Sequence, residues 1–109
     1  MLPALLLAVA LAPAPQEPAA APAESAQTHI DAGLAQFRKR RFAKAEAHFR
    51  EAVEAEPSSA PANWYLGYTT YKIAEPKRPF HPDKQKAAAL FAKAYELDPA
   101  FRPAWGPRR

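Results

Sequence analysis

The chain has 109 residues, among them 13 prolines and 3 glycines but no cysteine, and its formal net charge is +4. A chain of this length holds one domain with a small hydrophobic core. The lack of cysteine excludes a disulfide framework, a thiolate zinc site and a cysteine nucleophile. A charge of +4 is too mild to decide the class of partner by itself.

Residues 1–23 have the pattern of an export signal followed by a spacer. The apolar run Leu2–Ala12 matches the hydrophobic region of a secretory signal, and it is too short to cross a hydrocarbon core of about 30 Å as a helix. The Ala/Pro-rich stretch Pro13–Glu24 is expected to be an extended spacer. We therefore expect an exported protein, in a bacterial periplasm or secreted, with no transmembrane anchor. If the segment is a disordered tail instead, a cytoplasmic protein is expected.

From residue 24 onward the sequence predicts helices. Apolar and small residues recur at helical spacing over residues 26–38, 42–56, 61–73 and 83–98, with another helix start near 103–105. Pro57 and Pro99 end the second and fourth helices, and Asp83 has the right residue type for the N-cap of the fourth. The predicted fold class is all-α. The small residues Gly33 and Gly67 predict close approach of neighbouring antiparallel helices.

Two halves of an internal repeat are visible. The motif Ala-x3-Phe-x2-Ala-x4-Pro begins at Ala45 and again at Ala87, an offset of 42 residues. A glycine followed four residues later by an aromatic occurs at Gly33 and Gly67, an offset of 34. Eight extra residues therefore lie between the halves of the second copy, in the stretch 74–82, whose three prolines indicate a surface turn.

A period of 34 with this motif resembles the tetratricopeptide repeat family, whose pattern is Trp-x2-Leu-Gly-x2-Tyr, then Ala-x3-Phe-x2-Ala and a closing Pro. Leu66 and Gly67 match its first half, but Asn63 holds the Trp position and Trp64 follows one residue late. The resemblance implies a right-handed superhelical stack of antiparallel helix pairs within a domain over residues 24–109. Repeat one would span residues 26–59, repeat two 60–101 with the insertion, and a stub of a third repeat 102–109.

The resemblance also implies a concave peptide-binding surface lined by the first helix of each repeat. Each of these helices carries an apolar stripe at positions i, i+4 and i+7, followed by a basic residue. Such a groove would suit a peptide with aliphatic anchors and an acidic flank. The alternative is that the stripes are core. The candidate binding residues are Ile30, Leu34, Phe37, Arg38, Trp64, Tyr68, Tyr71 and Lys72.

Catalytic, metal and cofactor motifs are not found in the sequence. The three histidines, His29, His48 and His81, lie 19 and 33 residues apart, so no histidine pair has i, i+4 spacing. No serine stands in a Gly-x-Ser-x-Gly motif. The basic run Arg38–Arg41 has no interleaved aromatic residue, which disfavours nucleic acid and favours a solvated turn.

The sequence thus predicts a non-enzymatic interaction module or scaffold that binds a protein or peptide partner, with no cofactor and no metal. The alternative prediction is a truncated or self-associating repeat protein that forms a homodimer through an open C-terminal end, because stable solenoids usually contain about three repeats and a capping helix.

Overall fold

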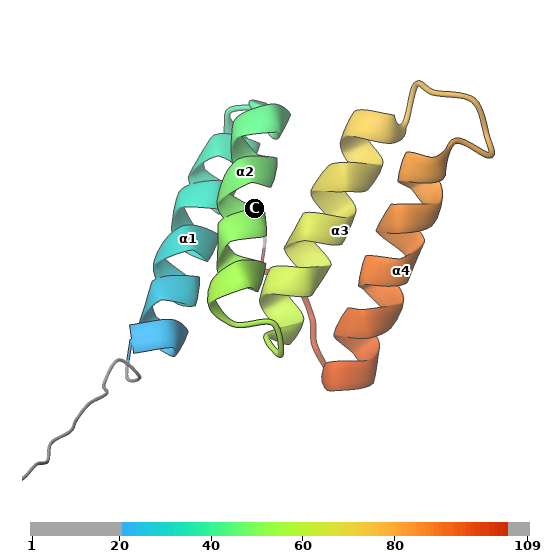
Figure 1. Ribbon diagram of the computed structural model, residues 1–109. Coiled ribbons are helices and arrows are strands. Elements are labelled where there is room, and N and C mark those ends of the chain that lie inside the picture. The colour runs from blue at the N-terminus through green and yellow to red at the C-terminus, as the bar shows by residue number, and fades with distance from the viewer. Residues whose placement is uncertain (1–20, 105–109) are drawn as a thin grey trace, which may run out of the picture.

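The computed structural model describes residues 21–104, and this part of the chain holds four helices and no strand. They are α1 (Ala21–Arg38), α2 (Phe42–Ala55), α3 (Ala60–Ala74) and α4 (Pro82–Leu97). Figure 1 shows that successive helices run antiparallel, with α1 beside α2 and α3 beside α4. Helix α2 packs on α3 and joins the two pairs. The all-α prediction is confirmed, and the right-handed superhelical sense stays a prediction.

The helix boundaries agree with the sequence within one residue except at the start of α1. This helix begins at Ala21, so the predicted extended spacer is wrong at its C-terminal end. Pro22 is compatible with the first turn, where backbone N–H groups have no intrahelical partner. The predicted export signal lies within residues 1–20, outside the described residues. The helix start predicted near 103–105 is wrong for residues 103 and 104, which are not helical, and residue 105 lies outside the described residues.

The N-cap of α4 is His81, and the prediction of Asp83 as the cap is wrong. Pro82 occupies the first helical position, which proline favours, so the cap falls one residue before it. His81 Nδ1 accepts a hydrogen bond of 3.0 Å from the backbone N–H of Asp83. Asp83 lies in the first turn and accepts a 2.9 Å hydrogen bond from Lys77, which lowers the pKa of its carboxyl group. The residues between α3 and α4 form an exposed loop.

Buried polar side chains hold the turn between the two helix pairs. Ser59 caps α3, since its Oγ accepts a 3.1 Å hydrogen bond from the N–H of Ala62. Asn63 is 3% exposed and donates from Nδ2 to the carbonyls of Pro57 at 3.0 Å and Ser59 at 2.8 Å. The amide thus ties the turn to the start of α3, which gives Asn63 a structural role at the position where the family pattern has Trp.

Close helix contact depends on the two described helical glycines. Phe49 is fully buried, and its ring lies so near Gly33 that an added Cβ would be 2.5 Å from Phe49 Cε1. A Cβ on Gly67 would lie 3.0 Å from Cβ of Leu90. The predicted close approach of α1 to α2 and of α3 to α4 is therefore confirmed.

The segment after α4 covers part of α3. The Phe101 ring meets the Tyr65 ring edge-on at 6.0 Å, and the N–H of Ala104 donates a 2.7 Å hydrogen bond to the Tyr65 hydroxyl. Burial raises the pKa of Tyr65, and the hydrogen bond from Ala104 opposes this effect. This segment thus packs on the second helix pair after the last helix has ended.

Candidate functional site

The aromatic side chains predicted on two separate helices meet in the fold. The Phe37 ring from α1 lies 5.9 Å from the Tyr68 ring of α3. Tyr68 stacks on Trp64 at 5.3 Å with an interplanar angle of 11°, and its ring lies 6.1 Å from that of Tyr71. The two sequence stripes therefore form one continuous aromatic row across α1 and α3.

The row divides into core and surface residues. Ile30 and Trp64 are 4% and 9% exposed and belong to the hydrophobic core. These two predicted groove residues therefore pack beneath the surface residues of the row. Trp64 is buried because α3 packs on both α2 and α4. Its Nε1 also donates a 2.9 Å hydrogen bond to the Tyr95 hydroxyl of α4. The partly buried residues are Leu34, Phe37 and Tyr68, whereas Tyr71 is 38% exposed.

An open pocket of about 360 Å³ lies at the surface end of this row. Phe37, Arg38, Arg40 and Tyr68 line it, and we call it the aromatic-basic pocket. Phe37, Arg38 and Tyr68 are candidates from the sequence, and the structure brings them together. The lining side chains offer two aromatic rings and two guanidinium groups, which suit binding of an apolar group beside an anion.

Arg40 lines the pocket but was not among the binding residues predicted from the sequence. It lies in the turn between α1 and α2 with a backbone φ of 61°, a left-handed conformation that is uncommon for a residue other than glycine. The guanidinium carbon lies 5.5 Å from the centroid of the Phe42 ring, within cation–π range. The basic run Arg38–Arg41 does not by itself indicate this backbone conformation, and for this reason the sequence favoured a solvated turn.

Lys72 adds positive charge near the pocket. Its Nζ lies 3.0 Å from Glu75 Oε1, and this hydrogen bond raises the pKa of Lys72, while the positive charge of nearby Arg40 acts in the opposite direction. Lys72, one of the two basic residues that follow the stripes, is thus partly neutralised by Glu75. The two guanidinium groups that line the pocket, Arg38 and Arg40, are the cations that could attract an anionic ligand group.

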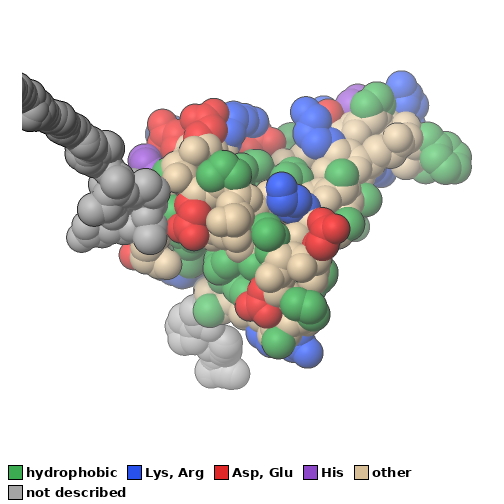
Figure 2. Space-filling view, turned by 60° about the horizontal axis from the view of Figure 1, so that its bottom comes forward, with side chains coloured by type: hydrophobic (Ala, Val, Ile, Leu, Met, Phe, Trp, Pro, Cys, Tyr) green, Lys and Arg blue, Asp and Glu red, His purple; other side chains and the backbone are tan. Residues whose placement is uncertain are grey.

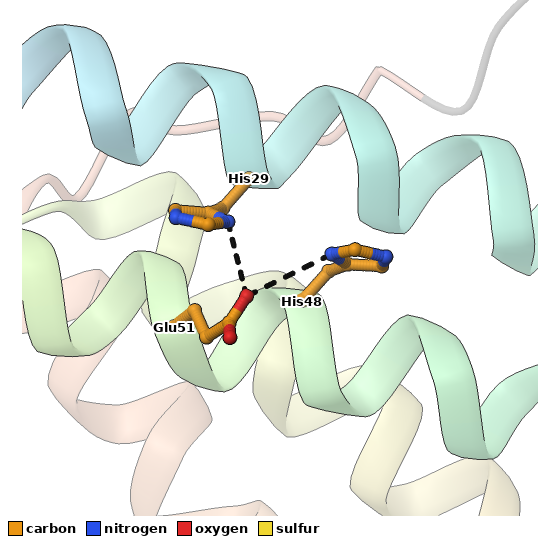
Figure 3. A group of neighbouring side chains, drawn as sticks. All are labelled: His29, His48 and Glu51. Atoms are coloured by element: carbon orange, nitrogen blue, oxygen red, sulfur yellow. Dashed lines mark ion pairs between the residues drawn. The ribbon is translucent and has the colours of Figure 1, made fainter.

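A polar group of three residues lies between α1 and α2. Figure 3 shows His29 on α1 facing Glu51 on α2, with His48 of α2 on the other side of the same carboxylate. His29 Nδ1 lies 3.1 Å from Glu51 Oε1, and His48 Nδ1 lies 3.9 Å from the same oxygen. Spacing along one helix does not predict this group, because His29 lies on α1 whereas His48 and Glu51 lie on α2. The antiparallel pairing that sets Gly33 against Phe49 places His29, one turn earlier, opposite Glu51.

Comparison with known proteins gives two related sequences. Over 74 residues the chain is 32% identical to Tetratricopeptide repeat protein 37 of Xenopus laevis, and over 73 residues it is 34% identical to Superkiller complex protein 3 of Mus musculus. These matches cover 68% and 67% of the chain, which spans 4% of the length of each relative. No protein-family model matches the chain, and no solved structure gives a significant match. None of the four described helices has the length and apolar character needed to cross a membrane.

Proposed function

We propose that this chain is a tetratricopeptide-repeat-like protein that works as a non-enzymatic module and binds a peptide segment of a protein partner. The observation that carries this proposal is the aromatic-basic pocket. Its two rings offer apolar faces to an aliphatic side chain, and its two guanidinium groups offer donors to a neighbouring carboxylate. We also propose that the protein acts outside the cytoplasm, as the pattern of its first 23 residues indicates.

The packing behind the pocket favours a preformed binding surface. Tyr68 is held between the rings of Trp64 and Phe37, so its orientation is fixed before a ligand arrives. A rigid surface loses little conformational entropy on binding. The volume lies near the lower end of the range for ligand pockets, about 300–1,000 Å³, and therefore fits one or two side chains of a peptide.

Arg40→Gly tests the pocket without threatening the fold. Glycine adopts a positive φ without strain, so this variant keeps the turn while it removes one guanidinium group. The probe is a labelled peptide with one leucine flanked by aspartates. We expect the variant to bind it at least about tenfold more weakly than the wild type, because a hydrogen bond to a charged group contributes about 1.5–3 kcal/mol. Fluorescence anisotropy measures the affinity, and circular dichroism checks the helicity.

Arg102→Gly is the matched control, because it removes the same charge from the exposed segment after α4. We expect its affinity to equal that of the wild type, and we expect the peptide with asparagine in place of aspartate to bind more weakly. Tyr68→Ala should also weaken binding while the helices persist. Equal affinity of wild type and Arg40→Gly, or failure of the wild type to bind the aspartate peptide, would contradict the proposal.

Self-association is the alternative proposal. It is supported by Tyr95 and Leu97 near the end of α4, which are 38% and 37% exposed. Figure 2 shows hydrophobic side chains among charged ones on the face that includes the lower ends of the helices. Under this proposal, light scattering of the full chain gives the mass of two chains, and Leu97→Glu returns it to that of one. The mass of a single chain at every concentration would rule the dimer out.

A further inference from the structure

The group formed by His29, His48 and Glu51 has the arrangement of a metal site. One potential ligand atom from each residue lies within 4.8 Å of the other two. Glu51 Oε1 lies between the two imidazoles (Figure 3), whose ring centroids are 6.5 Å apart and whose planes differ by 28°. Two of the three residues come from α2 at i, i+3, and the third comes from α1.

Contacts within the described part of the chain leave one nitrogen of this group unsatisfied. His48 Nδ1 is shielded from solvent and has no hydrogen-bond partner among the described residues. Its distance of 3.9 Å from Glu51 Oε1 is too long for a hydrogen bond. A polar atom without water or a partner is costly for a fold. The nitrogen is directed toward the same carboxylate that His29 contacts, so one ligand held between the three residues would satisfy it.

The spacing and the chemistry of the three ligands fit a first-row divalent transition ion. Tetrahedral zinc with bonds of about 2.0–2.2 Å separates its ligand atoms by about 3.4 Å. The distances of 3.1 and 3.9 Å from Glu51 Oε1 to the two nitrogens lie on either side of this value, and all three ligand atoms lie within 4.8 Å of one another. Side-chain rotations that bring the two imidazoles closer together would admit the ion. Two imidazoles with one carboxylate suit zinc, whereas magnesium and calcium prefer an all-oxygen set.

We propose that His29, His48 and Glu51 bind one zinc ion, with water at the remaining position. The side chains are 34%, 36% and 56% exposed, so the group lies close to the surface, where water can supply the remaining ligand once His48 rotates to open its shielded Nδ1. The bound ion links α1 to α2 and thereby holds the first helix pair together. This role is separate from peptide binding, because none of its three ligands lines the aromatic-basic pocket.

The test is calorimetric titration of the metal-free full chain with zinc chloride. We expect one saturable site per chain and an affinity at least about tenfold lower in each of His29→Gln, His48→Gln and Glu51→Gln. Zinc should also raise the thermal unfolding temperature of the wild type, and these variants should lose that shift. Magnesium chloride should give neither effect.

Two matched variants serve as controls. Glu54→Gln makes the same change as Glu51→Gln one turn further along α2, and His81→Gln changes a histidine outside the group. Both should bind zinc like the wild type. Circular dichroism establishes that each variant is folded, and the substitution of Glu51, the most exposed of the three, keeps the test decisive if a histidine variant unfolds. Absence of a saturable site, or unchanged affinity in Glu51→Gln, would overturn the proposal.

Discussion

Phe49→Ala is expected to lower the free energy of unfolding by about 3–5 kcal/mol, because truncation of a buried phenylalanine removes apolar contacts and leaves a cavity. Phe49 is fully buried, stacks on Tyr65 at 5.4 Å and fills the space beside Gly33. A small domain is stable by only about 0.05–0.15 kcal/mol per residue, so this loss removes a large share of the total. Urea denaturation followed by far-ultraviolet circular dichroism measures it.

Phe80→Ala provides the control for this substitution. It removes the same atoms from a side chain that is 82% exposed in the loop between α3 and α4. We expect a change within about 0.5 kcal/mol, as for most surface substitutions. A similar loss in both variants, or a loss below about 1 kcal/mol in Phe49→Ala, would mean that the core does not lie where the structure places it.

The second large effect is expected for Gly33→Ala, and its sign separates packing from helix propensity. Propensity alone predicts that alanine in the middle of α1 stabilises the chain by about 1 kcal/mol. The new Cβ would instead lie 2.5–2.8 Å from three atoms of the Phe49 ring, which is fully buried. Overpacking of this kind costs about 1–3 kcal/mol, and the severity of the overlap places it at the upper end. We therefore expect a net loss of about 1–2 kcal/mol by the same urea measurement.

Two further variants check the cause of this loss. Gly67→Ala should cost less, since its new Cβ meets its nearest atom, Leu90 Cβ, at 3.0 Å. In the double variant Gly33→Ala/Phe49→Leu, the smaller leucine leaves room for the methyl group, so the combined loss should be less than the sum of the two single losses. A Gly33→Ala variant that is more stable than the wild type would contradict the packing of α1 on α2.

The repeat pattern was enough to predict the helices because it reports local features. Proline positions, small residues and helical spacing depend on near neighbours, and they located α2, α3 and α4 within one residue. The predicted N-cap of α4 was wrong because a residue whose side chain can accept a hydrogen bond lies on each side of Pro82. Proline favours the first helical position, and this preference makes His81 the N-cap. The preference of aspartate for the N-cap and the preference of proline for the first helical position gave different answers there, and the type of one residue could not decide between them.

The candidate site was only partly predictable because burial depends on neighbours far away in the sequence. Periodicity identifies one face of α3, but it does not say that α2 and α4 enclose this helix and bury Trp64. The place of Arg40 depends on a left-handed turn, and the meeting of His29 with Glu51 depends on how two helices pair. These features follow from tertiary packing, for which the spacing within one helix carries no signal.

The central claim is that the aromatic-basic pocket binds a peptide, and chemical-shift mapping on the isotope-labelled full chain tests it most directly. Titration with the leucine–aspartate peptide is predicted to shift the signals of Phe37, Arg38, Arg40 and Tyr68 most strongly, and Arg40→Gly should abolish these shifts at the same peptide concentration. Shifts confined to Tyr95 and Leu97 at the end of α4, or no shifts at all, would contradict it.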